Sequence, residues 1–185
     1  PYTVYESIIR AGEIAQRAPT GPTYLSVSTE TLMDEWNLPD NARTVPAAPR
    51  MLTAPEDIEK LTNQLASAKM PIVLTEAAGQ DVESYQALLD LCEELALPIV
   101  ENPGALFSNF PKDHPLHQGH NFKQFWDDVD LVMVIRMRAP WYPPSERPPN
   151  ATIAIIGSNC LFVSQNPSID TSSAVVINFL KKTNN

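Results

Sequence analysis

Short apolar runs alternate with longer amphipathic stretches along the middle of the chain, and this order constrains the fold more than any other feature. The runs are rich in β-branched residues, which is typical of parallel strands buried on both faces. They are PIVLT (71–75), PIVE (98–101), LVMVI (131–135) and ATIAIIG (151–157). Helical spacing of apolar residues precedes the first run at 53–69 and follows it at 81–96. The alternation predicts an α/β fold with an open, mostly parallel sheet that carries helices on both faces.

The two predicted helices have recognisable starts and apolar faces. Thr53 and Glu56 have the spacing of a capping box at the start of the first helix. Asp81 is suited to cap the second helix, because its carboxylate can accept backbone N–H groups. We expect the apolar face of the second helix to be formed by five residues: Val82, Tyr85, Leu89, Cys92 and Ala96.

The first fifty residues read differently from the rest of the chain. Apolar spacing predicts a helix over 2–18, and the alternating segment TYLSVS (23–28) predicts a strand. One helix and one strand cannot form a sheet of their own, so residues 1–30 are interpreted as the end of a preceding domain. Prolines over 37–50 exclude a regular helix or a central strand there. We therefore expect a linker at 31–52, a central α/β domain at 53–160 and a less periodic tail at 161–185.

Composition and charge restrict the partners and the compartment. The 185 residues carry a formal net charge of −9, which argues against a nucleic-acid or anionic-membrane partner. Two cysteines without a pattern, Cys92 and Cys160, favour a reducing compartment, and Cys92 is expected to be a small buried residue. The sequence has no signal peptide, membrane-spanning apolar run or lipidation motif. These features predict a soluble cytoplasmic protein.

Candidate ligand-binding residues follow two of the predicted strands. Open α/β sheets bind ligands beyond the carboxyl ends of their strands. Glu76 and Gly79 follow the run at 71–75, and Arg136 and Arg138 follow the run at 131–135. Glu76 could accept a hydrogen bond from a ribose hydroxyl, and the two arginines could bind an anion. The preferred alternative is that the arginines pair with Glu76 or with the aspartate cluster at 127–130, and a turn with a single glycine is a weak nucleotide signal.

Three histidines at a spacing of three, His114, His117 and His120, could bind Zn²⁺ if they lay on one helical face. Pro115 and Gly119 argue against a regular helix, so a solvated loop is the preferred interpretation. The sequence therefore predicts no metal site among these residues.

Two further clusters allow a functional and a structural interpretation. Three carboxylates before a strand could bind a cation, or could form a solvated helix end, which we prefer: Asp127, Asp128 and Asp130. Three aromatic residues could stack on a ligand, or could pack against their own loop or a neighbouring subunit, which is commoner: Trp126, Trp141 and Tyr142.

An ordered set of segments resembles thiamine-diphosphate-dependent enzymes. RAPTGPTYLSVS (17–28) resembles the hinge that ends their first domain, and EDIEKLTNQLASAKMPIVLTEAAGQ (56–80) resembles the start of their middle domain. LALPIVE, NFPKDHPLHQGH and DDVDLVMVI continue the pattern in the same order, so the resemblance extends from about residue 8 to about residue 157. The segment APWYPP (139–144) is similar to acetolactate-synthase-like and benzoylformate-decarboxylase-like members. After residue 157 the family's Asp-x-Asp-Pro-like segment is replaced by SNCLFVSQNP.

The resemblance implies a non-catalytic middle domain. In this family that domain is a six-stranded parallel unit of the DHS-like NAD/FAD-binding type. Thiamine diphosphate and Mg²⁺ are held by other domains, through a glutamate and a Gly-Asp-Gly motif, and no Gly-Asp-Gly occurs in this chain. The implied parent enzyme acts on 2-oxo acids, assembles as a homo-oligomer and places its other domains against this one. No residue of this chain is assigned a catalytic role.

A free-standing module that binds FAD or ADP is the alternative to this interpretation. Some family members bind these nucleotides through a glycine-rich first turn and a Gly-x-Arg after the strand at 131–135. Here Arg138 aligns with that arginine, but Arg136 replaces the glycine, and Gly79 is the only glycine of the first turn. An arginine side chain fills space that a nucleotide would need, which argues against FAD or ADP.

Overall fold

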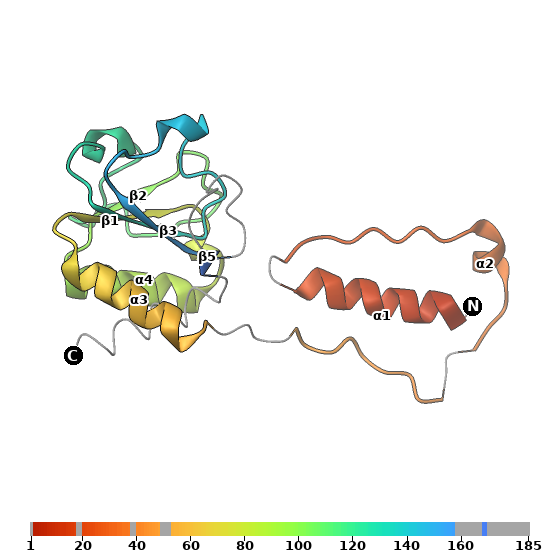
Figure 1. Ribbon diagram of the computed structural model, residues 1–185. Coiled ribbons are helices and arrows are strands. Elements are labelled where there is room, and N and C mark those ends of the chain that lie inside the picture. Colours follow the sequence, from red (N-terminus) through yellow and green to blue (C-terminus); the bar gives the residue numbers. More distant parts are fainter. Residues whose placement is uncertain (1, 18–19, 38–39, 49–52, 158–167, 170–185) are drawn as a thin grey trace. The chain divides into compact units, whose positions relative to one another are not determined.

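The computed structural model describes residues 2–17, 20–37, 40–48, 53–157 and 168–169. The chain divides into two compact units, Pro1–Arg50 and Met51–Asn185, which are described separately (Figure 1). The division between Arg50 and Met51 falls inside the segment 31–52 that the sequence predicts as a linker. Among the described residues, no helix combines the length and the apolar character needed to cross a lipid bilayer.

The first unit is built around one helix, α1 (Tyr2–Gln16), which confirms the predicted helix. The proline-rich segment packs against this helix. The Tyr5 hydroxyl accepts a hydrogen bond from the backbone N–H of Arg43 at 2.6 Å, and a Cβ atom on Gly12 would lie 2.7 Å from a Val45 methyl group. A short helix, α2 (Thr29–Met33), is capped by Ser28. Part of the predicted linker therefore belongs to this unit.

The strand predicted over residues 23–28 is wrong. Residues 20–28 have no strand assignment and run beside α1 as an irregular segment (Figure 1). The Thr23 hydroxyl donates to the Ala11 carbonyl at 3.2 Å, and the Gly21 N–H donates to the Ala15 carbonyl at 3.2 Å. A β-prone sequence forms a strand only beside a hydrogen-bonded neighbour, and the described part of this unit supplies none.

The second unit contains an open parallel sheet, as predicted. Its strands lie in the order β2-β1-β3-β4-β5, and every pair is parallel. They are β1 (Pro71–Thr75), β2 (Ile99–Glu101), β3 (Leu131–Ile135), β4 (Thr152–Ile156) and β5 (Ser168–Ile169). One further segment pairs with the free edge of β2 through a single parallel bridge between Ile99 and His117. The described residues thus form five strands and one bridge, not the six strands expected, and the tail segment 174–180 lies outside them.

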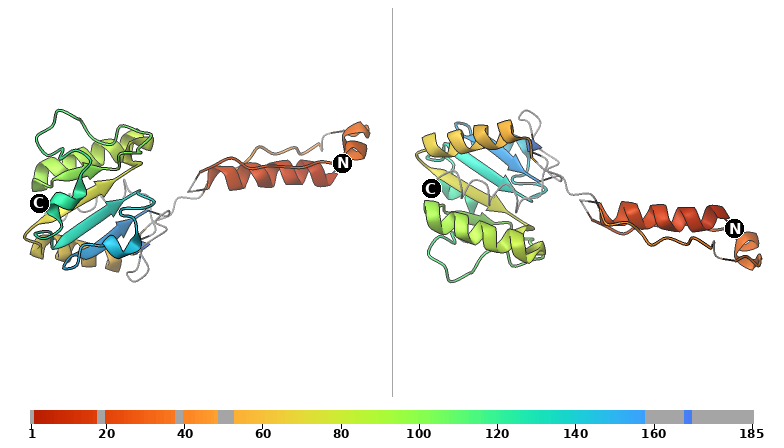
Figure 2. Two further views of the ribbon diagram at one scale, coloured as in Figure 1. Left: turned by 90° about the horizontal axis from the view of Figure 1, so that it is seen from above. Right: turned by 90° about the horizontal axis from the view of Figure 1, so that it is seen from below.

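Two helices cover one face of this sheet. Both α3 (Pro55–Ser67) and α4 (Val82–Leu95) lie on the same side of the strands (Figure 2). Their apolar residues pack on one set of alternate strand positions: Val73, Ile99, Leu131, Met133, Ile135, Ala154 and Ile156. The other set of strand positions packs on the opposite face, beneath the connections that lead into β3 and β4.

The prediction of helices on both faces is wrong for the described residues. The second face is covered by two 3₁₀ turns, η2 (Phe122–Phe125) and η3 (Pro144–Glu146), and by the loops that carry them (Figure 1). Several prolines interrupt both connections, and proline removes a helical hydrogen bond and blocks the preceding turn. Aromatic side chains supply the apolar surface that a helix would have supplied: Phe122, Trp126 and Trp141.

The ends and faces of the helices differ in part from the prediction. Asp81 caps α4, because its Oδ1 accepts the Ser84 N–H at 2.7 Å, as predicted. The capping box is wrong: Ala54 occupies the N-cap of α3, without a side-chain bond. The next residue is a proline, which needs no N–H partner there. The predicted α4 face is also wrong in part, because Val82 is 84% exposed while the bulkier Leu88 and Leu91 are fully buried.

Candidate functional site

The chain reverses direction across the sheet between β1 and β3. The connection after β1 contains α4 and crosses one face to β2, whereas the connection after β3 crosses the other face to β4. Such a reversal is the topological switch point at which open α/β sheets place their ligands. Thr75 and Ile135 are partners in the parallel register, so Glu76 and Arg136 begin the two loops that meet here. The switch point contains all four predicted site residues.

Glu76 and Arg138 pair with each other. Glu76 is only 5% exposed, and its Oε2 accepts the backbone N–H of Arg138 at 2.9 Å. Its Oε1 accepts Nε of Arg138 at 2.9 Å and also contacts the terminal guanidinium nitrogen Nη2. Hydrogen bonding to Glu76, together with its charge, raises the pKa of the Arg138 guanidinium above its usual value. The carboxylate of Glu76 is therefore engaged within the chain.

Arg136 is held by a residue that the sequence did not mark as a site partner. Its guanidinium donates to Oδ2 of Asp81, the residue that caps α4. Partial burial would raise the pKa of Asp81, but hydrogen bonds from Ser84 and the charge and hydrogen bond of Arg136 hold it below its usual value. The backbone of Arg136 has φ of 46°, in the left-handed region that favours glycine. This backbone accords with the expectation that Arg136 stands at a glycine position.

Gly79 packs directly against the backbone of the loop that contains Ser108 and Asn109. A Cβ atom at this position would lie 1.9 Å from the carbonyl oxygen of Ser108. The Gly79 N–H donates to Oδ1 of Asn109 at 2.9 Å. The absence of a side chain at Gly79 thus permits close packing of the loop that follows β2.

Asn109 is the main site residue that the sequence analysis missed. Its side-chain amide donates to the carbonyl oxygens of Glu76 and Phe107, both at 3.0 Å, while its Oδ1 accepts from Gly79. The residue is fully buried. No local pattern distinguishes it, because its two partners in the first turn, Gly79 and Glu76, lie 30 and 33 residues earlier in the chain.

A small cavity of about 150 Å³ lies on the second face of the sheet, beside the switch point. Its walls include the apolar residues Leu74, Val100 and Trp141, while Glu101, Asn102 and His120 contribute polar groups. The volume is below the roughly 300 Å³ at which pockets for drug-sized ligands begin. The cavity is therefore suited only to a small molecule.

The three histidines do not form one cluster. His114 lies 3.3 Å from a Glu93 carboxylate oxygen and packs edge-on against Phe110. His117 and His120 are in ring contact, with centroids 6.0 Å apart. Within the described ranges, no group of three or more histidine, cysteine or acidic residues could hold a metal ion.

Asp130 has a structural partner in the described region. Its carboxylate accepts the backbone N–H groups of Lys69 at 2.6 Å and Met70 at 2.9 Å, just before β1. Desolvation would raise the pKa of Asp130, but these hydrogen bonds outweigh it and hold the pKa below its usual value. Asp127 and Asp128 are exposed, in keeping with the preferred interpretation of a solvated end.

The aromatic residues separate into a packed pair and an exposed residue. Trp126 and Trp141 pack edge-to-face at 6.4 Å, and both contact Phe122, while Tyr142 is 77% exposed. Cys92 is fully buried, as predicted, and burial raises the pKa of its thiol to about 12. Cys160 lies outside the described residues.

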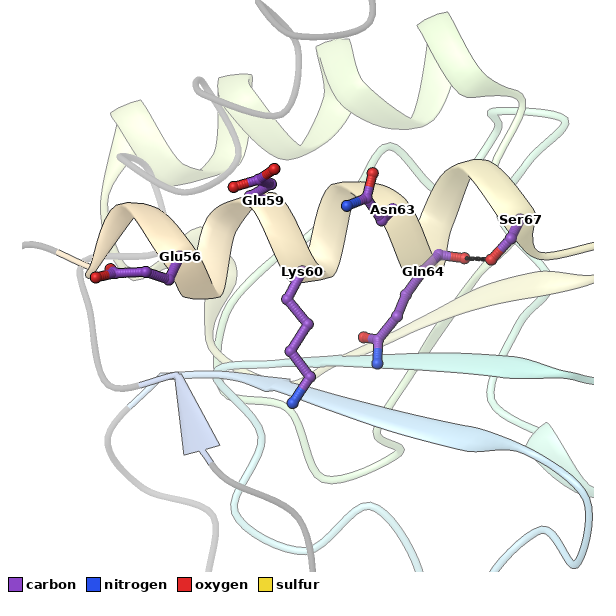
Figure 3. A pocket seen from close by; sticks show the side chains of 6 residues that line it. All are labelled: Glu56, Glu59, Lys60, Asn63, Gln64 and Ser67. Carbon is purple, nitrogen blue, oxygen red and sulfur yellow. Dashed lines mark hydrogen bonds between the residues drawn. The ribbon is translucent and has the colours of Figure 1, made fainter.

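A second hollow runs along the outer surface of α3, and Figure 3 shows the six polar residues that line it. None of them is buried. The bond drawn there, from the Ser67 hydroxyl to the Gln64 carbonyl at 3.0 Å, is internal to the helix (Figure 3). This surface is the solvated side of an amphipathic helix.

The fold matches solved thiamine-diphosphate-dependent enzymes, although no family model matches the chain. An enzyme from Mycobacterium smegmatis described as thiamin diphosphate-dependent aligns with a TM-score of 0.75 and 19% identity, over 96% of this chain and 36% of that one. Benzoylformate decarboxylase from Polynucleobacter necessarius aligns with a TM-score of 0.73 and 23% identity, over 95% and 35%. The thiamine diphosphate-dependent 4-hydroxybenzoylformate decarboxylase from Rhodococcus jostii RHA1 aligns with a TM-score of 0.72 and 20% identity, over 98% of this chain and 36% of that one. The chain spans about a third of the length of these enzymes, as expected for one region such as the middle domain.

Proposed function

We propose that this chain is the central, non-catalytic region of a thiamine-diphosphate-dependent enzyme that acts on a 2-oxo acid. In this proposal, the C-terminal end of a preceding domain occupies residues 1–30, and a proline-rich linker occupies residues 31–52. The central domain then occupies residues 53–160, followed by a divergent tail at 161–185. The observation that carries it is a likeness of fold over almost the whole chain that accounts for only about a third of each enzyme. At the switch point the candidate binding residues are bonded to one another or to the chain, which agrees with a region that binds no cofactor itself.

The residues present do not fit thiamine diphosphate. The chain has no Gly-Asp-Gly motif for Mg²⁺ and the diphosphate. At the switch point, Glu76 and Arg138 neutralise each other, and so do Asp81 and Arg136. The chemistry of carbon–carbon bond cleavage or formation beside a carbonyl would belong to the cofactor and to the other domains. The function proposed for this chain is to space those domains and to help subunits assemble.

The partners in this proposal are the other domains of the same polypeptide and further copies of it. Apolar exposure on the first unit supports such contacts. Ile8 is 51% exposed, Tyr24 is 92% exposed and Met33 is 80% exposed on a unit of only fifty residues. A contact with another domain or another copy of the chain would bury such exposed apolar side chains.

A nucleotide-binding module remains the alternative, and the left-handed backbone at Arg136 is the observation in its favour. Two observations argue against a nucleotide site. The Ser108–Asn109 loop fills the space beside Gly79, and each arginine is bound to a carboxylate. Thermal unfolding of the purified chain distinguishes the two functions. FAD, ADP or thiamine diphosphate with Mg²⁺ should leave the Tm unchanged. A ligand at about one hundred times its Kd would add about 2.7 kcal/mol, so a Tm rise with FAD or ADP would favour the module.

The parent activity is tested with the full polypeptide that the surrounding coding sequence specifies. With thiamine diphosphate and Mg²⁺, it should release CO₂ from a 2-oxo acid or join two 2-oxo acids. Replacing Arg136 by Met should leave kcat and KM for the 2-oxo acid within about twofold, since a group that touches no reacting atom does not stabilise the transition state. The proposal fails if the coding sequence contains no Gly-Asp-Gly segment or if the polypeptide binds no thiamine diphosphate.

A further inference from the structure

The cavity beside the switch point has a buried, apolar base. Side chains from β1, from β2 and from the connections on either side of β3 form this base, and each is at most 8% exposed: Leu74, Val100, Phe122, Met137 and Trp141. All of them belong to one apolar cluster, so close packing holds the walls in place. An engineered apolar cavity of about 150 Å³ binds benzene, and the volume here is about 150 Å³ as well. The base therefore has the size of a single aromatic ring.

The exposed lining residues mark the open side of the cavity, and polar groups lie there. His120 is exposed, and its Nδ1 is 3.2 Å from the Glu101 carbonyl oxygen. Because a carbonyl oxygen only accepts hydrogen bonds, Nδ1 carries the hydrogen, and Nε2 of the neutral ring is an acceptor. Asn102 also lines the cavity, and its Oδ1 accepts the Gly104 N–H at 2.8 Å. Its NH₂ group is therefore the part that can donate to a ligand.

The lining suits an uncharged ligand. Side chains alternate along a strand, and Ile99 packs on the first face of the sheet whereas Val100 packs on the second. Glu101 consequently directs its carboxylate to the first face, away from the cavity, and binds Lys112 there. Among the described residues, the lining contains no other carboxylate and no lysine or arginine. A charged ligand would lose its hydration in this cavity without gaining an ion pair.

We propose that this cavity binds an uncharged molecule with one aromatic ring and a hydroxyl group, such as phenol. The ring occupies the apolar base, where Phe122 and Trp141 offer edge-to-face contacts and the Met137 sulfur favours an aromatic neighbour. The hydroxyl group lies at the open side, where it donates to Nε2 of His120 and accepts from the Asn102 amide. A hydroxyl group can do both, whereas an aldehyde or ketone only accepts. This inference does not depend on the proposed function.

Methyl NMR of the full chain, titrated with phenol, tests the site. An aromatic ring shifts the signals of nearby methyl groups, so the signals of Leu74, Val100 and Met137 should move together. They should approach saturation at about 10 mM phenol, because a very small ligand binds weakly. The methyl signals of Leu61 and Leu91, which pack on the first face of the sheet, are the internal controls and should stay in place.

A filling variant tests the position of the ring. Ala139 lines the cavity, so Ala139→Leu should place a larger side chain in it and remove the phenol-induced shifts. Ala66→Leu makes the same change on the exposed surface of α3 and should keep the wild-type Kd. The inference is overturned if the three cavity methyl signals do not respond to about 20 mM phenol, or if the control signals move equally. It is also overturned if Ala139→Leu binds phenol as well as the wild type does.

A second variant tests the hydroxyl group and decides even if Ala139→Leu fails to fold. His120→Leu removes the acceptor at Nε2, so the Kd for phenol should rise about fivefold, as expected for one hydrogen bond. Benzene has the same ring without a hydroxyl group, so its Kd should stay within about twofold of the wild-type value. An unchanged Kd for phenol, or an equal rise for both probes, would overturn the assignment of a hydroxylated ligand to this cavity.

Discussion

Gly79 gives the most direct test of how the switch point is closed. An alanine Cβ would lie 1.9 Å from the Ser108 carbonyl oxygen, about 1.5 Å short of an ordinary contact. Because the obstructing atom belongs to the backbone, a side-chain rotation cannot relieve the clash. The loop would have to move, and the 2.9 Å bond from Gly79 to Asn109 would break. Gly79→Ala should therefore destabilise the second unit.

The expected decrease in the free energy of unfolding has two contributions, overpacking and the lost hydrogen bond. Overpacking costs about 1–3 kcal/mol, and one buried hydrogen bond contributes about 1 kcal/mol. A total of about 2–4 kcal/mol corresponds to a Tm decrease of roughly 10 °C for a unit of this size. Tryptophan fluorescence during urea or thermal unfolding is a suitable probe, because Trp126 and Trp141 belong to the second unit.

Gly104→Ala is the matched control for this measurement. Gly104 is exposed, and the nearest atom to its added Cβ would be Oδ1 of Asn102 at 3.5 Å. The control should change the free energy of unfolding by less than about 0.5 kcal/mol. If Gly79→Ala unfolds at the same temperature as Gly104→Ala, then Gly79 is not closely packed against the loop. That result would leave the turn free to approach a ligand.

Three further changes test neighbouring parts of the structure by urea or thermal unfolding. Arg136→Gly should change the free energy of unfolding by less than about 1 kcal/mol. Glycine relieves the strain of the left-handed backbone, and this gain offsets the lost ion pair with Asp81 and the greater freedom of the unfolded chain. A loss above about 2 kcal/mol would contradict this reasoning. Thr75→Val should raise the Tm, because the buried Thr75 hydroxyl has no hydrogen-bond partner among the described residues, and a lower Tm would mean that the hydroxyl is bonded. Folding lowers the pKa values of the Asp81 and Asp130 carboxylates, so their ionised forms stabilise the fold fully above the unfolded pKa of about 3.9. This stabilisation is lost as the pH falls through the lower folded pKa values. Asp130→Asn should therefore make stability less sensitive to acid, and an unchanged dependence of stability on pH would contradict the assignment.

The sequence predicted the strands well because burial alone specifies them. Runs such as 71–75 and 131–135 are apolar at almost every position, and the interior of a parallel sheet buries almost every residue of a strand. Features that depend on a distant partner were predicted less well. The segment at 23–28 has strand composition without a neighbouring strand, and the second sheet face is covered by aromatic loops because proline prevents helices there.

For the candidate site, local sequence located the residues but did not determine their use. Parallel topology places the ends of β1 and β3 together, so Glu76 and Arg136 could be assigned to one crevice without a structure. Whether that crevice is open depends on Asn109, which comes from the loop after β2 and has no distinguishing sequence pattern. The use of the two arginines depends in the same way on their partners, because Asp81 binds Arg136 and Glu76 binds Arg138.

Two separate sets of contacts close the switch point, and this determines what would reopen it. Asn109 fixes the turn through backbone groups of Glu76 and Gly79, whereas Asp81 fixes the Arg136 side chain. The two loops are also joined directly, because the Ala77 N–H donates to the Arg136 carbonyl at 3.1 Å and Glu76 binds Arg138, so removing either contact alone leaves both loops held. A functional nucleotide site would need the first turn freed from Ser108 and the arginine freed from its carboxylate at the same time. With these contacts intact, neither the first turn nor the Arg136 side chain is available to a nucleotide at the switch point.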